Sequence, residues 1–90
     1  MSAIYVLVNC EPGKVLQAKK AMEDLKAADE VHVVTGRYDI VAVFKGVNLN
    51  KLLETVATKL HKVPGVKSTE TLVGLPEGIS DESPQVTMGG

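Results

Sequence analysis

The 90-residue chain has too few cysteines and histidines for the cross-links that stabilise many small domains. Cys10 is the only cysteine, so no disulfide can form within the chain. Cys10, His32 and His61 lie far apart in the sequence and show none of the short ligand spacings that zinc sites use. A domain of this size buries only about 60–65% of its unfolded surface. We therefore expect self-association to stabilise it, and we expect no metal or other cofactor.

The chain also lacks an excess of basic residues. Ten basic and eleven acidic residues give a net charge of −1. Nucleic-acid-binding proteins normally present a basic face that neutralises phosphates, whereas the four lysines within residues 14–26 are offset by Glu23 and Asp24. We therefore expect no direct contact with nucleic acid.

Long apolar segments and targeting signals are missing too. No apolar run approaches the roughly 20 residues of a membrane-spanning helix. The N-terminal sequence MSAIYVLVN has neither the basic region nor the cleavage pattern of a signal peptide. These features predict a cytoplasmic protein that does not bind membranes.

Motifs typical of enzyme active sites are absent as well. The sequence has no tryptophan and one phenylalanine, and it contains no nucleophile elbow, phosphate-binding loop or paired carboxylates. His32 alternates with valines, a pattern more typical of a packed or edge histidine than of a catalytic base. His61 stands at the end of a predicted helix, where the helix dipole favours it. We expect the protein not to be an enzyme.

What the chain does contain is a regular succession of β-rich and helical segments. Strands are predicted from β-branched or alternating residues at 3–9, 31–34, 39–44 and 66–73. Apolar residues at helical spacing predict a helix of about four turns at 15–25, and a second helix at 49–60 that Asn48 caps. The βαββαβ order, with right-handed crossovers, predicts an α+β ferredoxin-like plait. In that fold a four-stranded antiparallel sheet carries two helices on one face.

The first predicted strand is apolar on both sides. One side carries Ala3, Tyr5 and Leu7, and the other side carries Ile4, Val6 and Val8. The two helices of the plait cover only one face of the sheet, so the second face needs a different cover. The simplest cover is a second copy of the same sheet, packed face to face. The strand pattern therefore predicts a homodimer.

The composition divides the chain near Leu75. All predicted strands and helices lie before this residue, and the sequence PEGISDESPQVTMGG that follows has few apolar anchors. We expect residues 1–75 to form one domain. Residues 76–90 would form a flexible C-terminal tail, or an arm that lies on a partner subunit.

The stretch TGRYD at residues 35–39 concentrates polar chemistry in the predicted hairpin turn. As a turn alone, it would use Gly36 for a positive φ, Asp39 to accept from a nearby backbone N–H and Tyr38 to pack its ring. Arg37 is the only arginine beside nine lysines. Its planar guanidinium suits a carboxylate ligand, but it also suits an exposed turn or a salt bridge between subunits. From the residues alone, a simple hairpin turn is favoured, and a binding site remains the alternative.

Three segments resemble the ligand-binding domain of Lrp/AsnC-type transcriptional regulators: AIYVLVNCEPGKV, TGRYDIV and VPGVKSTETLV, in this order and spacing. The resemblance runs from about Ala3 to Leu75, and T-G-x-Y-D with the later T-x-T is its most specific part. It implies a dimeric α+β barrel, assembly of dimers into rings and an amino acid or similar small effector bound between dimers. Full-length members also carry an N-terminal helix-turn-helix. Because this chain begins at the first strand, we expect a stand-alone module, with full-length regulators as further candidate partners.

The resemblance places the effector pocket at the TGRYD turn. The chemistry of the turn suits such a ligand, because free backbone N–H groups at Gly36 and Arg37 can hold an α-carboxylate and Asp39 can pair with an α-ammonium. Hydroxyl groups from the fourth strand would complete the polar set. The implied ligand-binding residues are Thr35, Gly36, Arg37, Tyr38, Asp39, Thr69 and Thr71. Arg37 stands at the variable position of the motif, so no role transfers to it.

Three other interpretations remain. NCEPGKV is loosely similar to the acidic-x-Pro-Gly stretch of ACT domains, which would place an amino acid near residues 11–14. Cofactor-free monooxygenases and small isomerases use the same dimeric barrel, with catalysis between sheet and helices. A purely structural module would join full-length regulators in mixed assemblies. The TGRYD and TET segments favour the Lrp/AsnC resemblance over the ACT alternative, and the missing catalytic motifs disfavour an enzyme.

Overall fold

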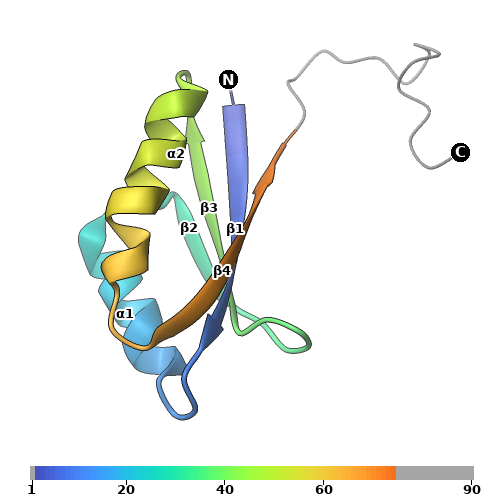
Figure 1. Ribbon diagram of the computed structural model, residues 1–90, viewed down its shortest axis with the longest axis vertical. Coiled ribbons are helices and arrows are strands. Elements are labelled where there is room, and N and C mark those ends of the chain that lie inside the picture. The colour runs from blue at the N-terminus through green and yellow to red at the C-terminus, as the bar shows by residue number, and fades with distance from the viewer. Residues whose placement is uncertain (1, 75–90) are drawn as a thin grey trace, which may run out of the picture.

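The computed structural model describes residues 2–74, in which a four-stranded sheet carries two helices on one face (Figure 1). The strands are β1 (Ser2–Cys10), β2 (Glu30–Val33), β3 (Ile40–Gly46) and β4 (Val66–Val73). The helices are α1 (Val15–Leu25) and α2 (Leu49–Thr58), and α2 is followed by the short 3₁₀ helix η1 (Leu60–Lys62). The predicted boundary at residue 75 and the predicted tail at 76–90 lie outside the described residues.

The strand order in the sheet is β2-β3-β1-β4, and every neighbouring pair is antiparallel. This is the βαββαβ arrangement expected of the ferredoxin-like plait, so the predicted fold class is confirmed. The two central strands are β1 and β3, and the edges are formed by β2 and β4. Both α1 and α2 lie on the same side of the sheet (Figure 1).

Local chemistry accounts for where the two helices begin and end. The side-chain oxygen of Asn48 accepts from the backbone N–H of Lys51 at 3.1 Å, which confirms the predicted cap of α2. Helix α1 has 11 residues, about three turns rather than the predicted four. Lys26 ends it directly after Leu25, the last predicted position, by adopting a left-handed φ of 56°, with its N–H donating to the carbonyl of Glu23.

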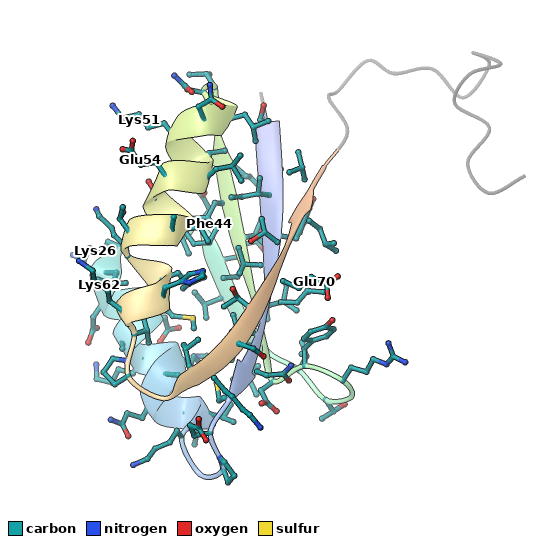
Figure 2. The ribbon with its side chains drawn as sticks, viewed as in Figure 1. Lys26, Phe44, Lys51, Glu54, Lys62 and Glu70 are labelled. Atoms are coloured by element: carbon teal, nitrogen blue, oxygen red, sulfur yellow. The ribbon has the colours of Figure 1, made fainter. Side chains whose placement is uncertain are left out.

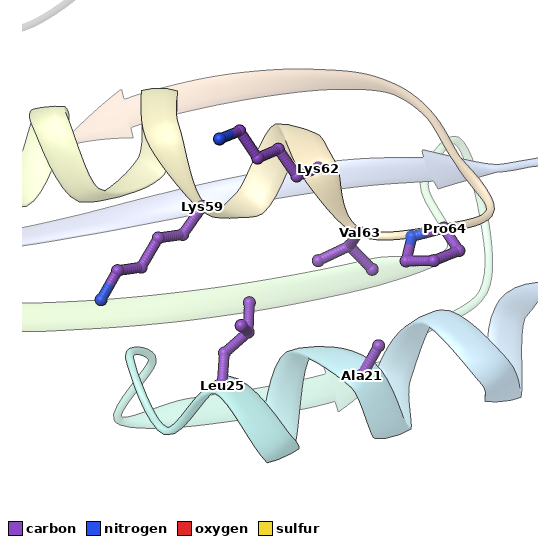
Figure 3. A pocket seen from close by; sticks show the side chains of 6 residues that line it. All are labelled: Ala21, Leu25, Lys59, Lys62, Val63 and Pro64. Atoms are coloured by element: carbon purple, nitrogen blue, oxygen red, sulfur yellow. The ribbon is translucent and has the colours of Figure 1, made fainter.

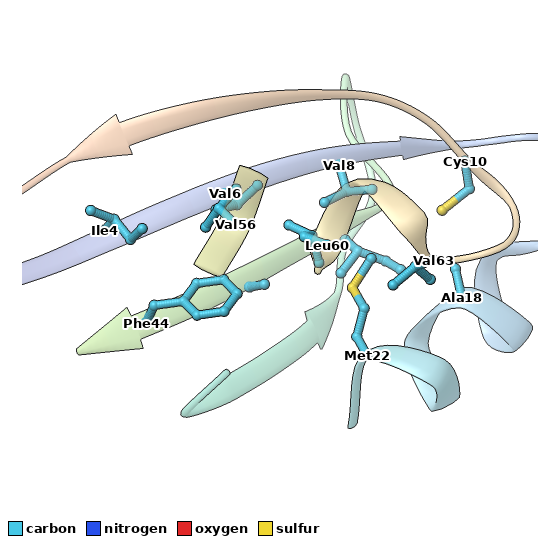
Figure 4. Packing of buried hydrophobic residues seen from close by; sticks show 12 residues of the cluster. Ile4, Val6, Val8, Cys10, Ala18, Met22, Phe44, Val56, Leu60 and Val63 are labelled. Atoms are coloured by element: carbon cyan, nitrogen blue, oxygen red, sulfur yellow. The ribbon is translucent and has the colours of Figure 1, made fainter. Parts of the chain in front are cut away.

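The core lies between the sheet and the two helices (Figure 4). Ile4, Val6 and Val8 of β1 are fully buried and face the helix layer. Met22 reaches them from α1 and Val56 from α2. Each fully buried aliphatic side chain of this size stabilises the fold by about 1.5–3 kcal/mol relative to an exposed one.

The other face of the sheet is also apolar, and no described element covers it. The strand register pairs Tyr5 with Val43 and with Leu72 on either side of β1, and it pairs Leu7 with Val41. Tyr5 is 40% exposed and Leu72 is 45% exposed. The prediction that β1 is apolar on both sides is therefore confirmed. We call this surface the open face and define its apolar part as Ala3, Tyr5, Leu7, Val41, Val43 and Leu72, of which only Val43 is buried in the single chain.

Candidate functional site

The TGRYD segment forms the loop between β2 and β3, and this loop projects from the sheet on the side away from the helices (Figure 1). The backbone N–H of Val34 donates to the carbonyl of Asp39 at 2.9 Å and closes the loop. Gly36 has a φ of +116°, which side-chain-bearing residues rarely adopt. A Cβ atom at Gly36 would meet no heavy atom within 4 Å. The backbone conformation, and not crowding, therefore requires glycine here.

Asp39 fixes the loop to the end of β1. Its Oδ2 accepts a hydrogen bond from the backbone N–H of Cys10 at 2.8 Å, and its own N–H donates to the carbonyl of Val8 at 2.9 Å. The pairing of β1 with β3 ends at Val8 and Ile40, so the N–H of Cys10, two residues further along β1, needs a partner outside the ladder. The Asp39 carboxylate supplies that partner. Burial, and then the charge of Asp39, raise the pKa of the Cys10 thiol.

Tyr38 fixes the loop to β4. Its hydroxyl donates to Oε1 of Glu70 at 2.5 Å, which joins residues 32 positions apart in the chain. The hydrogen bond to Glu70, followed by burial and the Glu70 charge, raises the pKa of Tyr38, and Arg37 opposes this shift. Glu70 points away from the helix layer (Figure 2). The contact therefore lies on the open face.

The tip of the loop keeps polar groups available to a ligand. Thr35, Gly36 and Arg37 are exposed. Within residues 2–74, the backbone N–H groups of Gly36 and Arg37 donate no hydrogen bond, and the Arg37 guanidinium forms no salt bridge. Adjacent free N–H groups and a guanidinium form a suitable receptor for a carboxylate.

The two threonines expected at the site lie on the opposite face of the sheet. Thr69 pairs with Val8 and Thr71 with Val6, so both side chains share the helix-covered face with these valines. The Thr69 hydroxyl lies 3.2 Å from Nε2 of His61. In the single chain, the structure brings Thr35–Asp39 together but does not bring Thr69 or Thr71 to them.

Glu70 is the β4 residue that reaches the loop, and it was not among the residues predicted for the site. The alternation in STET already separates it from its threonine neighbours, because successive side chains in a strand point to opposite faces. Only the pairing of the strands reveals that its face is the one on which Tyr38 lies.

The alternative sites have different geometry. In the segment that resembles an ACT motif, Glu11 donates its N–H to the carbonyl of Gly65 at 2.8 Å and accepts from the N–H of Lys14 at 3.0 Å, so this backbone is already engaged. A shallow groove of about 120 Å³ lies between α1 and η1 in the helix layer, away from the loop (Figure 3). Its lining is apolar with two lysines: Ala21, Leu25, Lys59, Lys62, Val63 and Pro64.

Two further features bear on the class of protein. Across the described residues, no three His, Cys, Asp or Glu side chains lie close enough to hold a metal ion. None of the helices within residues 2–74 is long and apolar enough to cross a membrane.

Known regulators are similar to this chain in sequence. An uncharacterised HTH-type transcriptional regulator of Pyrococcus furiosus is 34% identical over 68 residues, a match that covers 76% of this chain and 46% of the regulator. The chain spans about half the length of the HTH-type regulators that it matches.

Solved structures share the fold. A protein of Thermus thermophilus superposes with a TM-score of 0.76 at 30% identity, covering 84% of this chain and 95% of that chain. A transcriptional regulator of Neisseria meningitidis, solved as its L-Met complex, has a TM-score of 0.67 at 17% identity and covers 88% of this chain and 53% of its own. At that identity, the second likeness shows the fold alone.

The family that emerges is one of transcriptional regulators and not of enzymes. The Lrp/AsnC ligand-binding domain matches residues 3–83, which is nearly the whole chain. The matched range contains the sheet, both helices and the TGRYD loop. The chain belongs to the Lrp/AsnC ligand-binding domain family.

Proposed function

We propose that this protein is an effector-binding and oligomerisation module, which holds an amino acid or a similar small molecule at the TGRYD loop between dimers. The observation that carries the proposal is the loop itself. Asp39 and Tyr38 fix its shape from two different strands, while the N–H groups of Gly36 and Arg37 remain free at its tip within the described part of the chain. The L-Met complex of the Neisseria regulator supports an amino acid as the class of ligand.

The chemistry of the loop suits the carboxylate end of an amino acid. The two N–H groups and the Arg37 guanidinium provide hydrogen bonds that replace part of the water lost from a carboxylate. Since Asp39 already accepts from Cys10 and Tyr38 donates to Glu70, the loop requires little further ordering when the ligand arrives. A preformed site loses less free energy on binding than a site that must become ordered.

The open face supports the oligomerisation part of the proposal. Its apolar residues lie on the side of the sheet that α1 and α2 leave uncovered. Burial of apolar surface contributes about 25 cal/mol per Å², and a stable interface buries about 800 Å² on each partner. A second copy of the sheet, packed face to face, would form the dimeric α+β barrel. Dimers would then assemble into rings, and full-length regulators could join the same assemblies.

Isothermal titration calorimetry with the twenty common amino acids tests the ligand. At least one of them should bind the wild-type chain, and Arg37→Gln should weaken that binding about ten- to a hundredfold by removing a charged hydrogen-bond donor. Lys67→Gln is the matched control, because Lys67 is an exposed cation on β4 outside the loop. If no amino acid binds while the dimer persists, the protein is a structural module. If binding is equal in wild type and Arg37→Gln, the arginine has no part in the site.

A further inference from the structure

Glu70 is a carboxylate set within apolar surface. It pairs with Leu7 across the β1–β4 ladder, and Leu72 follows it on the same face of β4. Its partner in the structure is the Tyr38 hydroxyl, which engages Oε1. A hydroxyl orients the carboxylate but does not neutralise its charge.

The acidic residue Glu30, also on the open face, is neutralised within the chain. Oε1 of Glu30 lies 2.9 Å from Nε2 of His32, and Oε2 lies 3.3 Å from Nζ of Lys45. These partners lower the pKa of Glu30, the His32 hydrogen bond contributing most. No cation within residues 2–74 forms a salt bridge with Glu70.

This difference matters when the open face is covered. A carboxylate that loses water without gaining a cation is strongly unfavourable, so a covered Glu70 requires a positively charged group. Asp39, which the sequence suggested for the ammonium group, already uses Oδ2 to accept from the N–H of Cys10 at the end of β1. Glu70 uses Oε1 to anchor the Tyr38 hydroxyl, and this contact leaves its negative charge without a cation.

We propose that Glu70, oriented by the Tyr38 hydroxyl at the β4 edge of the open face, is the acid that binds the ammonium group of the effector. The ligand class is a primary amine that also carries a carboxylate, with its carboxylate at Arg37 and the loop N–H groups. Tyr38 follows Arg37 in the chain and donates to Glu70, so it acts as a positioning residue. This inference rests on the proposed function, since it assigns one end of the same ligand.

Charge-specific variants separate this role from a structural one. Glu70→Gln keeps a side-chain oxygen that can accept from Tyr38, so the contact between the loop and β4 remains while the negative charge is lost. Glu30→Gln is the matched control on the same face, because Glu30 already pairs with Lys45. Tyr38→Phe keeps the ring and removes only the orienting hydroxyl.

The probes are the twenty common amino acids and, for an amino acid that binds, two analogues that each keep only one of its charged groups. For L-methionine these analogues are 3-(methylthio)propylamine, which lacks the carboxylate, and 4-(methylthio)butanoate, which lacks the amine. In calorimetry, Glu70→Gln should lose about ten- to a hundredfold in affinity for the amino acid and for the amine. Its affinity for the carboxylate analogue should equal that of wild type. Tyr38→Phe should show the same selective loss but to a smaller extent, and Glu30→Gln should behave as wild type.

The possible failures are distinguishable. If no amino acid binds wild type, the proposed function fails, and this inference fails with it. If an amino acid binds wild type and Glu70→Gln equally, only the role of Glu70 is overturned. Sedimentation tests the alternative that Glu70 pairs with Arg37 of a second copy and not with the effector. If Glu70→Gln and Arg37→Gln both dissociate the oligomer while the affinity for the amine stays unchanged, Glu70 serves the interface and the inference is wrong.

Discussion

The carboxylate of Asp39 accepts a 2.8 Å hydrogen bond from the backbone N–H of Cys10, and this contact ties the β2–β3 loop to the end of β1. The two residues are 29 positions apart in the chain. The contact lies just beyond the last β1–β3 pair, which joins Val8 to Ile40. Asp39 thus satisfies a backbone N–H at the end of β1 and determines the position of the loop.

Asp39→Ala should destabilise the fold, because it leaves the N–H of Cys10 without its charged acceptor. The expected decrease in the free energy of unfolding is about 1–3 kcal/mol, measured by urea denaturation. Asp39→Asn keeps a side-chain oxygen that can accept from Cys10 and should lose less. Equal stability of Asp39→Ala and wild type would show that the contact contributes nothing to folding.

Gly36→Ala should also destabilise the fold, by about 1–3 kcal/mol, because alanine is strained at a φ of +116°. No heavy atom lies within 4 Å of the added Cβ, so the cost is backbone strain and not a clash. Thermal unfolding measures it. A variant with an unchanged melting temperature would indicate that the loop relaxes to another conformation.

Titration of Tyr38 should report its hydrogen bond to Glu70. Its pKa in the folded state is raised, chiefly by this bond, above the value of about 10 for an unfolded chain. The folded state therefore binds the phenolic proton more tightly. The contribution to stability is fully present below about pH 10 and is lost as the pH rises through the folded pKa.

Tyrosinate absorbance in the near ultraviolet follows this titration in a Tyr5→Phe background, which leaves Tyr38 as the only tyrosine. The midpoint should fall when Glu70→Gln is added, because the charged acceptor is then lost. A midpoint that does not respond to Glu70→Gln would mean that the two side chains do not interact in solution.

A charge on the open face should prevent dimer formation. Leu7→Asp places a carboxylate among the apolar residues of the centre of this face, where a second copy would have to desolvate it. Sedimentation at micromolar concentration should show a dimer or larger assembly for wild type and a monomer for the variant. Leu16→Asp is the control, since Leu16 is 75% exposed on α1 in the helix layer. A wild-type monomer under these conditions would contradict the proposed interface.

Much of the fold could be predicted because its signals are local. Apolar residues that recur at helical spacing place α1 and α2, Asn48 marks the first turn of α2, and Gly36 marks the loop. Apolar residues on both sides of β1 predict a sheet with two apolar faces. Each of these features depends on residues a few positions apart, whose conformational preferences do not require the rest of the chain.

The tertiary structure decides which β4 side chains lie near the TGRYD loop within one chain. The T-x-T pattern suggested Thr69 and Thr71, but pairing with Val8 and Val6 turns both toward the helices. The same register leaves Glu70 on the face where Tyr38 meets it. Period-two alternation divides a strand into two sets of side chains without saying which set faces the core. Only the register of β4 against β1, selected by burying Ile4, Val6 and Val8 under the helices, assigns each set to its face.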